Sequence, residues 1–517
     1  MSRETSLLEL LSCGGAGDVA IGATDGAPLA FGALRRQVER SIESLNALGV
    51  GRGDRVAIVM PNGPEMAVAF LSVTAASVAC PLNPGLREDE FAFYLGDLRA
   101  RALLVERGSV SAAIRAARRL GVRVLEAAAA GEAAGGFDIV AQDAAAAPRT
   151  AEPGPAACDD VALILHTSGT TSRPKMVPLT HANLIASARS VAATLRLTPA
   201  DRHLNVMPLF HIHGLVAGLL APLAAGSGVV CTPGFNALKF FAWMDQCRPT
   251  WVTAVPTMHQ AILARGERDA TRAVGHRLRL LRSSSAAMPP RALARLEALF
   301  EVPLVEAYGM TEAAHQMASN PLPPGRRKPG TVGEAAGAEL AIIDDAGRRL
   351  APGATGEIVI RGPGVTAGYE NNPQANASAF VDGWFRTGDQ GVIDGDGYLS
   401  ITGRLKEIIN RGGEKISPRE VDEVLMEHPA VVQAVTFALP HDTLGEDVGA
   451  AVVLHAGETL SERELRGFAG SRLADFKVPR RIVFVDEIPK GPTGKLQRIG
   501  LAASLGLASP IRVRTDS

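Results

Sequence analysis

The sequence predicts an α/β protein. A large N-terminal domain of parallel α/β sheets with a β-rich subdomain precedes a small mobile α+β C-terminal domain. Three observations predict this fold class. Up to about residue 330, apolar runs alternate with amphipathic stretches. Short β-like runs separated by glycine and aspartate turns follow. The last part of the chain alternates helix-like and strand-like runs again. Strand and helix patterns in alternation are typical of parallel sheets covered by helices. A chain of 517 residues also exceeds one ordinary core, so we expect several packed units.

The elements of the large domain follow each other in order. Apolar runs at 55–60, 161–165, 278–283 and 302–308 are typical of buried strands. Stretches beginning at Pro64, His181 and Pro289 are typical of helices. The segment 127–157 is rich in Ala, Gly and Pro and shows little periodicity, so we expect a surface excursion there.

The last third of the chain changes its pattern twice. The runs AELAIID, GEIVIRG and GYLSITG, divided by turns such as Asp396-Gly397, predict a β-rich subdomain over about 330–402. Helix-like and strand-like runs then alternate from Leu405 onward. The predicted boundary lies near Gly403 to Lys406, which gives a large domain over 1–404 and a small domain over 405–517.

Composition limits the classes of function. The 53 basic residues balance 54 acidic ones, so the formal charge of -1 produces no overall electrostatic field that would attract nucleic acid or an anionic membrane. Five scattered cysteines without CxxC spacing argue against a disulfide framework and a zinc site. The first residues do not resemble a secretory signal and no apolar run is long enough to cross a bilayer, so we expect a cytoplasmic protein without membrane insertion.

A loop rich in hydroxyl groups follows the predicted strand at 161–165. It runs His166-Thr-Ser-Gly-Thr-Thr-Ser-Arg-Pro-Lys175. Backbone N–H groups, hydroxyls and one lysine together suit a polyphosphate. The glycine spacing of the Walker motif is absent. By itself, the loop fits a polar surface segment without a ligand equally well.

Four further motifs follow this loop: YGMTE at 308–312, GWFRTGD at 383–389, GRLKEIINRGGEKISP at 403–418 and PTGK at 492–495. The ordered series resembles the superfamily of adenylate-forming enzymes, which includes acyl-CoA synthetases, peptide-synthetase adenylation domains and luciferases. The resemblance extends from about Leu29 to Lys495. It implies an AMP-forming acid–thiol ligase that makes an acyl-adenylate from ATP and transfers the acyl group to coenzyme A.

The resemblance implies a role for each matching residue of the large domain. The phosphates of ATP would be held by Thr167, Ser168, Gly169, Thr170, Thr171 and Lys175. Tyr308 would stack on adenine, Thr311 would contact the α-phosphate, and Glu312 would help to hold Mg²⁺. A carboxylate beside phosphate oxygens is sensible only with a cation between them.

The resemblance also implies roles for residues of the later motifs, some in adenylation and some in the transfer to the CoA thiol. Asp389 would accept hydrogen bonds from the ribose hydroxyls, and Arg404 would reach the same region. Lys406 would be the hinge, and Gly412, Gly413 and Lys415 would line the route of the CoA thiol. Lys495 would contact the carboxylate and the α-phosphate, where a cation stabilises the transition state more than the ground state.

Ser285, His315 and the run Thr253 to Gln260 point to a small polar acid. Ser285 belongs to the segment 282–286, which stands where many fatty acyl-CoA synthetases have a Gly-Gly pair, and His315 stands where small or apolar residues are common. His211 and His213 bring two more imidazoles to the neighbourhood, although His211 is widespread in the family and decides nothing by itself. A pocket lined with hydrogen-bond donors would be left unsatisfied by an apolar tail.

Longer runs narrow the resemblance further. The segments TSGTTSRPK, PLFHIHGL, TAVPTMHQ, EAYGMTEAAHQMASNPLP and NRGGEKISP resemble the oxalate–CoA ligases of plants and fungi. Oxalate is therefore the first candidate substrate, and Arg282 is the candidate partner of its second carboxylate. A medium-chain fatty acid, an aromatic acid and a carrier-protein thiol as acceptor remain alternatives. Monomer and homodimer are both compatible with the sequence.

Overall fold

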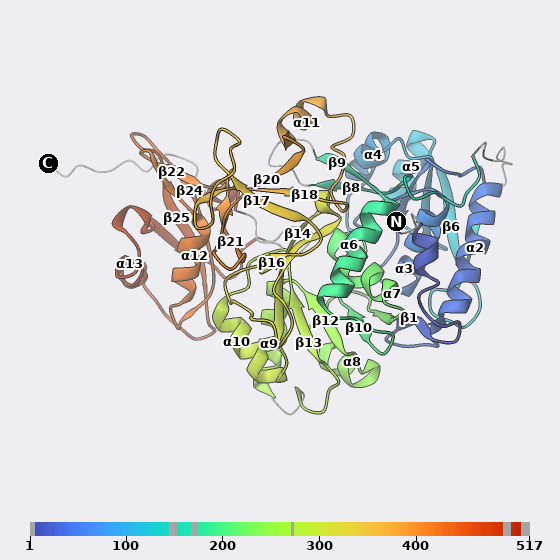
Figure 1. The fold of residues 1–517 in the computed structure, drawn as a ribbon, viewed down its shortest axis with the longest axis horizontal. Coiled ribbons are helices and arrows are strands. Elements are labelled where there is room, and N and C mark those ends of the chain that lie inside the picture. Colours follow the sequence, from blue (N-terminus) through green and yellow to red (C-terminus); the bar gives the residue numbers. More distant parts are fainter. Residues whose placement is uncertain are drawn as a thin grey trace. The chain divides into compact units, whose positions relative to one another are not determined.

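Strand–helix alternation dominates the first two thirds of the chain (Figure 1). The computed structural model describes residues 6–143, 150, 152–167, 174–269, 273–489 and 498–507. Two compact units form, one from Met1–Leu340 with Ile360–Phe385 and the other from Ala341–Val359 with Arg386–Ser517. The predicted α/β class with parallel sheets is confirmed. The boundary near Gly403 to Lys406 and the mobility of the small domain stay predictions.

A seven-stranded sheet of the first unit has the order β7-β6-β5-β3-β4-β8-β9. Its central strands are almost wholly buried, which explains their continuous apolar runs. The outer strands β7 and β9 pair antiparallel with their neighbours. The strands are β3 (Arg55–Val59), β4 (Val78–Pro81), β5 (Ala102–Glu106), β6 (Arg123–Ala129), β7 (Phe137–Ala141), β8 (Val161–Thr167) and β9 (Lys175–Thr180), and the accompanying helices are α2 (Phe31–Ala47), α3 (Pro64–Ala76), α4 (Glu88–Asp97) and α5 (Ala112–Leu120).

The segment 137–141 corrects one expectation. We expected a surface excursion over 127–157, but β7 extends the sheet and pairs with β6 over five residues. Phe137 and Ile139 are buried, with Asp138 exposed between them. This alternation of apolar and polar residues is too short to stand out from its Ala- and Gly-rich surroundings.

A nine-stranded sheet of the same unit has the order β16-β15-β14-β13-β12-β10-β11-β1-β2. The strands from β14 to β1 in this order run parallel to one another. Helices α9 (Pro256–Arg268) and α10 (Pro290–Phe300) pack together beside β12 and β13 (Figure 1). The strands are β1 (Val19–Ala23), β2 (Leu29–Ala30), β10 (Arg202–Asn205), β11 (Gly228–Cys231), β12 (Trp251–Ala254), β13 (Leu280–Ser283), β14 (Leu304–Met310), β15 (His315–Ser319) and β16 (Glu334–Ala335).

The helices α6 (His181–Thr194) and α8 (Phe240–Cys247), a π-helix over His213–Leu220, and α7 (Ala221–Ala224) complete this region. The π-helix and α7 are continuous, and both contact α6. π-Helical turns are rare and frequently lie at functional sites. Here the π-helix begins at a buried histidine, His213.

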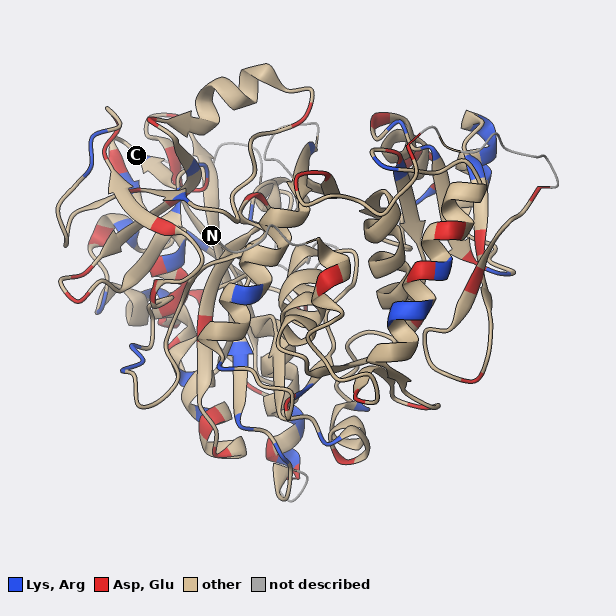
Figure 2. Cartoon of the chain, turned by 45° about the vertical axis from the view of Figure 1, so that its right-hand side comes forward, with Lys and Arg blue, Asp and Glu red and all other residues tan. Residues whose placement is uncertain are grey.

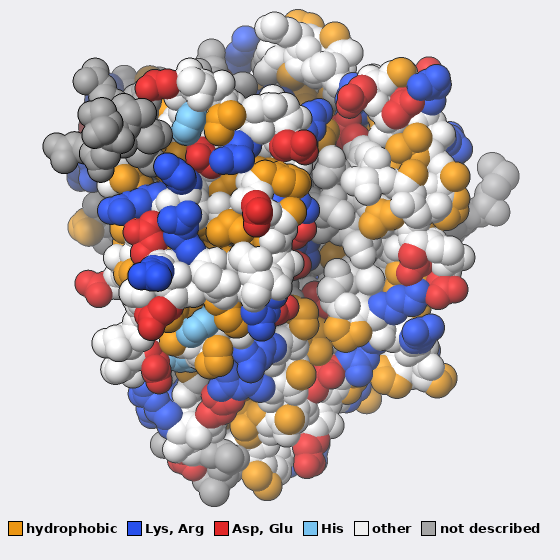
Figure 3. Space-filling model, turned by 90° about the vertical axis from the view of Figure 1, so that its left-hand side faces the viewer, with side chains coloured by type: hydrophobic (Ala, Val, Ile, Leu, Met, Phe, Trp, Pro, Cys, Tyr) orange, Lys and Arg blue, Asp and Glu red, His pale blue; other side chains and the backbone are white. Residues whose placement is uncertain are grey.

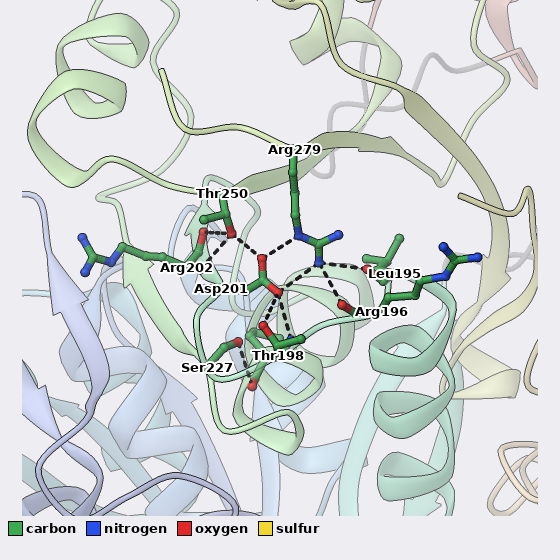
Figure 4. Close-up of polar contacts among 9 residues, drawn as sticks. Leu195, Arg196, Thr198, Asp201, Arg202, Ser227, Thr250 and Arg279 are labelled. Carbon is green, nitrogen blue, oxygen red and sulfur yellow. Dashed lines mark hydrogen bonds and ion pairs between the residues drawn. The ribbon is translucent and has the colours of Figure 1, made fainter. Parts of the chain in front are cut away.

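A buried carboxylate, Asp201, connects the beginnings of three parallel strands (Figure 4). Asp201 Oδ1 accepts hydrogen bonds from Arg279 Nε at 2.6 Å and from Thr250 Oγ1 at 2.7 Å. Its Oδ2 accepts from Arg279 Nη2 at 3.1 Å and from the backbone N–H of Thr198 at 2.9 Å. These side chains directly precede β10, β12 and β13. The network therefore fixes the amino ends of these strands, and the carboxyl ends of β12 and β13 lie at the opposite edge.

The second unit contains a sheet of order β23-β22-β25-β24, with β26 parallel to β25. Helices α12 and α13 bury Val421, Leu425 and Leu465 in one core with the strand residues Val448 and Val452. The elements are β22 (Ile409–Arg411), β23 (Glu414–Ile416), α12 (Pro418–Met426), β24 (Val431–His441), β25 (Gly445–Leu454), α13 (Glu462–Gly470), β26 (Arg481–Phe484) and α14 (Leu501–Ser504). The chain also contains a sheet of order β17-β18-β20-β19, with β21 on β20, and its segments do not all belong to the second unit. Its strands are β17 (Glu339–Ile343), β18 (Thr355–Arg361), β19 (Phe380–Val381), β20 (Trp384–Ile393) and β21 (Leu399–Arg404).

Charges of both signs are mixed along the described chain (Figure 2). On the face seen in Figure 3, Lys and Arg side chains lie among Asp and Glu side chains. Ion pairs of the second unit show the same mixing, with Lys477 on Glu420 at 2.6 Å and Arg481 on Glu462 at 3.1 Å. Such a surface agrees with the near-zero formal charge. Within the described residues, no helix combines the length and apolar character needed to cross a bilayer.

Candidate active site

Thr167 and Lys175, which stand on either side of the undescribed part of the hydroxyl-rich segment, lie on paired strands. Strands β8 and β9 pair antiparallel, and the pair Thr167 with Lys175 brings the two ends of the loop together. The Nζ atom of Lys175 lies 4.3 Å from the centre of the Tyr369 ring. The other predicted phosphate contacts, Ser168, Gly169, Thr170 and Thr171, lie outside the described residues.

The YGMTE motif forms the end of β14 and a single 3-10 turn, Thr311–Ala313. Tyr308 and Glu312 are buried, and Thr311 is partly exposed. Glu312 Oε1 accepts a hydrogen bond from the Tyr369 hydroxyl at 2.9 Å. Tyr369 therefore contacts both Lys175, which is predicted to bind phosphate, and Glu312, which is predicted to bind Mg²⁺.

Sequence reasoning missed Tyr369. Its surroundings, Ala367-Gly-Tyr369-Glu-Asn371, contain no repeated spacing and no further group that would indicate chemistry. Only the tertiary contacts with Glu312 and Lys175 give it a place in the candidate site.

Glu312 fits the role of a magnesium ligand. Mg²⁺ bound together with a nucleotide takes only one or two carboxylates, because phosphate oxygens and waters complete its shell. In the described part of the chain, no group of three or more His, Cys, Asp or Glu side chains is placed to hold a metal ion. One buried carboxylate beside Thr311 therefore suits a metal ion that arrives with ATP better than a metal cage made of protein.

A buried polar cluster lies at the carboxyl ends of β12 and β13. Thr253 and Arg282 are neighbours across these strands. His213 lies against both, with its Nε2 2.7 Å from Thr253 Oγ1 and 3.5 Å from Arg282 Nη1. On its other side, His213 Nδ1 lies 3.1 Å from Ser285 Oγ. The His315 ring stacks on the His213 ring with centres 4.8 Å apart. Ser285 and His315, both predicted from the sequence, are thus brought together.

Arg282 is the exceptional member of this cluster. It is fully buried, and burial lowers the pKa of its guanidinium from 12.5 to about 9. Its hydrogen-bond partners are neutral: Thr253, His213 and the Oε1 atom of Gln316 at 3.0 Å. Among the described residues, no carboxylate forms an ion pair with it and its Nε has no hydrogen-bond partner. Burying a cation without a counter-ion costs on the order of several kcal/mol. The buried guanidinium of Arg282 therefore indicates a binding site for an anion.

The backbone of the cluster is strained at two positions. Ser285 and His315 have φ angles of +74° and +104°, a region that residues with a Cβ atom rarely adopt. Gly309 allows the close approach of the His315 backbone, since a Cβ atom on Gly309 would lie 1.9 Å from the His315 carbonyl oxygen. Strain of this kind concentrates at ligand sites.

The two histidines of PLFHIHG have different contacts. His211 Nδ1 accepts the backbone N–H of His213 at 3.3 Å. The ring that contacts Ser285 and Thr253 directly is that of His213. Burial, followed by the charges of His315 and Arg282, lowers the pKa of His213 well below 6.5. The sequence brought both imidazoles to this neighbourhood and we predicted His211 as the pocket residue, whereas the contacts with Ser285 and Thr253 belong to His213.

The second unit brings two other predicted residues together. Asp389 and Arg404 are partners across β20 and β21, and Asp389 Oδ1 lies 3.1 Å from Arg404 Nε. The Asp389 side chain is 13% exposed and that of Arg404 is 48% exposed. A largely buried carboxylate held by an arginine retains acceptor positions for a pair of hydroxyls.

The predicted hinge and the glycine pair lie in turns of this unit. Lys406 is exposed in the turn after β21. Gly412 and Gly413 form a two-residue hairpin turn between β22 and β23, with φ angles of +59° and +100° that glycine adopts without strain. Lys415 follows on β23 and is exposed.

Lys495 lies outside the described residues. Three positions later, Arg498 is held by Asp422, with Nη2 2.8 Å from Oδ2, and by Glu407, with Nε 3.1 Å from Oε2. Glu407 follows the predicted hinge residue Lys406 directly. Arg498 is therefore tied to the beginning of the predicted small domain.

Comparison with known proteins identifies the family of this chain. The chain matches the AMP-binding enzyme family over residues 15–370 and the AMP-binding enzyme C-terminal domain over residues 420–495. It is 44% identical over 472 residues to an oxalate–CoA ligase of Arabidopsis thaliana, covering 90% of this chain and 91% of that protein. It is 46% identical over 478 residues to a probable CoA ligase of Humulus lupulus, covering 90% and 89%. ATP-bound MatB from Rhodopseudomonas palustris superposes with a TM-score of 0.85 at 29% identity, covering 95% and 97%. The chain therefore belongs to the AMP-binding enzyme family and is an acid–thiol ligase of the AMP-forming acyl-CoA synthetase type.

Proposed function

We propose that this enzyme converts oxalate, ATP and CoA to oxalyl-CoA, AMP and pyrophosphate. The observation that supports oxalate is the fully buried Arg282, whose described partners are neutral. One carboxylate of the acid is consumed by adenylation, whereas the second stays charged and would complement the guanidinium. The identity with an oxalate–CoA ligase supports the same substrate.

The polarity of the cluster also favours a short polar acid. Ser285, His213 and His315 present hydroxyl and imidazole groups at one place. An octanoate or benzoate ion has no second charge for Arg282, and its apolar part would leave these polar groups without partners. A medium-chain or aromatic acid is therefore the less favoured alternative.

In the first half-reaction, a carboxylate oxygen of oxalate would attack the α-phosphorus of ATP and pyrophosphate would leave. Thr167 and Lys175 would hold the leaving phosphates, Tyr308 would stack on the adenine and Thr311 would contact the α-phosphate. Mg²⁺, held in part by Glu312, would neutralise phosphate charge. Lys495 would place a cation beside the α-phosphate, where negative charge increases in the transition state.

In the second half-reaction, the CoA thiol would attack the oxalyl carbonyl and lose its proton, and AMP would leave. Asp389 and Arg404 would keep the ribose in place. The small domain would rotate about Lys406, withdraw Lys495 and bring the turn at Gly412 and Gly413 to the thiol route. Motion of a domain is a common way to separate two steps at one site.

An assay of pyrophosphate release tests this proposal. It compares oxalate, malonate, acetate, octanoate and benzoate with ATP and Mg²⁺, with and without CoA. Oxalate should give the highest kcat/KM, and thioester should form with free CoA. A rate with oxalate no higher than with octanoate would refute the substrate, and thioester formation only on a carrier protein would refute the acceptor. The cytoplasmic location and the choice between monomer and homodimer stay predictions.

A further inference from the structure

A continuous chain of polar contacts runs from Arg282 to Ser285. Arg282 Nη1 donates to Thr253 Oγ1 at 3.3 Å, and Thr253 Oγ1 lies 2.7 Å from His213 Nε2. His213 Nδ1 in turn lies 3.1 Å from Ser285 Oγ. Arg282, Thr253 and His213 are fully buried, whereas Ser285 is partly exposed. The contacts therefore lead from a buried cation to a hydroxyl that a bound acid can reach.

The directions of these hydrogen bonds follow from the guanidinium, which can only donate. Because the pKa of His213 lies well below 6.5, its ring is neutral and carries a single N–H. A proton on Nε2 would face the N–H of Arg282 Nη1, 3.5 Å away. With Nε2 as an acceptor, Thr253 can accept from Arg282 and donate to His213. The ring proton then lies on Nδ1 and is donated to Ser285 Oγ.

The tautomer of His213 decides what Ser285 can do. If Nδ1 donates, Ser285 Oγ accepts, and its own proton is available to a ligand. If Nδ1 were an acceptor, Ser285 would donate to the imidazole and lose that proton to the protein. Ser285 has a φ angle of +74°, so its backbone adopts an uncommon conformation at the place where this hydroxyl is needed.

We propose that Arg282 is a positioning residue: acting through Thr253, it fixes the His213 tautomer, so that Ser285 donates its hydroxyl proton to a carboxylate of oxalate. This inference rests on the proposed oxalate activity and deepens it. It separates two roles, because Ser285 contacts the acid whereas Arg282 and Thr253 act through the imidazole. The positive charge of Arg282 serves here to orient hydrogen bonds, in addition to balancing an anion.

Thr253→Val tests the middle of this chain. Valine has a shape similar to threonine but neither accepts from Arg282 nor donates to His213. We expect the KM for oxalate to rise about 10- to 100-fold, with a smaller change in kcat and with the KM for ATP within about twofold. Thr253→Ser restores a hydroxyl and should recover most of the oxalate affinity. Equal losses in both variants would show that packing at position 253 matters and not the hydroxyl.

Arg282→Met tests the origin of the chain with a neutral side chain of similar length. Replacement of a buried cation by an apolar residue should leave the melting temperature unchanged or higher. The KM for oxalate should rise at least as much as in Thr253→Val, because the charge that balances the anion is lost as well, and the double variant should be no worse than Arg282→Met alone. Effects that multiply in the double variant would refute the relay. If Arg282→Met does not fold, the comparison of Thr253→Val with Thr253→Ser decides the question.

The outcomes separate this inference from the proposed function. A wild-type enzyme that releases no pyrophosphate with oxalate would refute the proposed substrate. A wild-type enzyme that uses oxalate, together with a Thr253→Val variant of unchanged KM, would refute the positioning role alone.

Discussion

Tyr369 offers a sensitive test of the candidate nucleotide site. Its hydroxyl donates to Glu312 Oε1 at 2.9 Å, and its ring lies 4.3 Å from Lys175 Nζ. Tyr369→Phe removes the hydrogen bond and keeps the ring. A hydrogen bond to a charged acceptor contributes about 1.5–3 kcal/mol, and Glu312 is only 6% exposed, so solvent compensates little of the loss. We therefore expect kcat/KM for Mg·ATP to fall about 10- to 100-fold.

A second substitution separates the two contacts of Tyr369. Tyr369→Leu also removes the aromatic face beside Lys175, which adds about 0.5–2 kcal/mol to the loss. Steady-state kinetics with varied Mg·ATP at saturating oxalate measures both variants, and a thermal melt controls for folding. If Tyr369→Phe matches the wild type while Tyr369→Leu is impaired, the hydroxyl does not position Glu312, and the reasoning is refuted.

Three further predictions concern stability and mechanism. Asp201→Asn breaks the pairing with Arg279 and should lower the free energy of unfolding in urea by about 2–3 kcal/mol. The kcat/KM for oxalate should change less than about twofold. Unchanged stability would contradict the role of this network. Burial lowers the pKa values of His203 and His259 to about 3 and about 4, below the unfolded value of 6.5. The unfolded state therefore binds protons first as the pH falls below 6.5, and the free energy of unfolding should decrease by about 1.4 kcal/mol per pH unit for each histidine. A melting temperature that does not change from pH 6.5 to 5 would argue against this burial. Lys495→Ala should abolish adenylation and spare thioester formation from supplied oxalyl-adenylate, and equal loss of both steps would contradict the two-conformation mechanism.

Strands buried on both faces were the elements best predicted from the sequence. The runs at 55–60 and 161–165 correspond to β3 and β8, because a strand that is covered on both faces needs apolar side chains at successive positions. The edge strand β7 was not predicted. Only alternate residues of this edge strand are buried, and its short alternation resembles a loop.

The candidate site was predictable in its residue types but not in its connections. The ordered motifs predict Glu312, Ser285 and His315, since each lies within or beside a recognisable run. They do not predict that Arg282 is fully buried, because arginine is ordinarily exposed and its partner Thr253 is 29 positions away in the chain. Nor do they distinguish His213 from His211, since that difference depends on where the π-helix begins.

A competition experiment tests the central claim most directly. The enzyme would receive equal concentrations of oxalate, octanoate and benzoate with limiting ATP, Mg²⁺ and excess CoA, and mass spectrometry would quantify each acyl-CoA against the AMP released. The ratio of products reports the ratio of kcat/KM values. A buried Arg282 beside His213 and Ser285 predicts that oxalyl-CoA predominates, with one AMP formed for each thioester. Predominance of octanoyl-CoA or benzoyl-CoA would contradict the account.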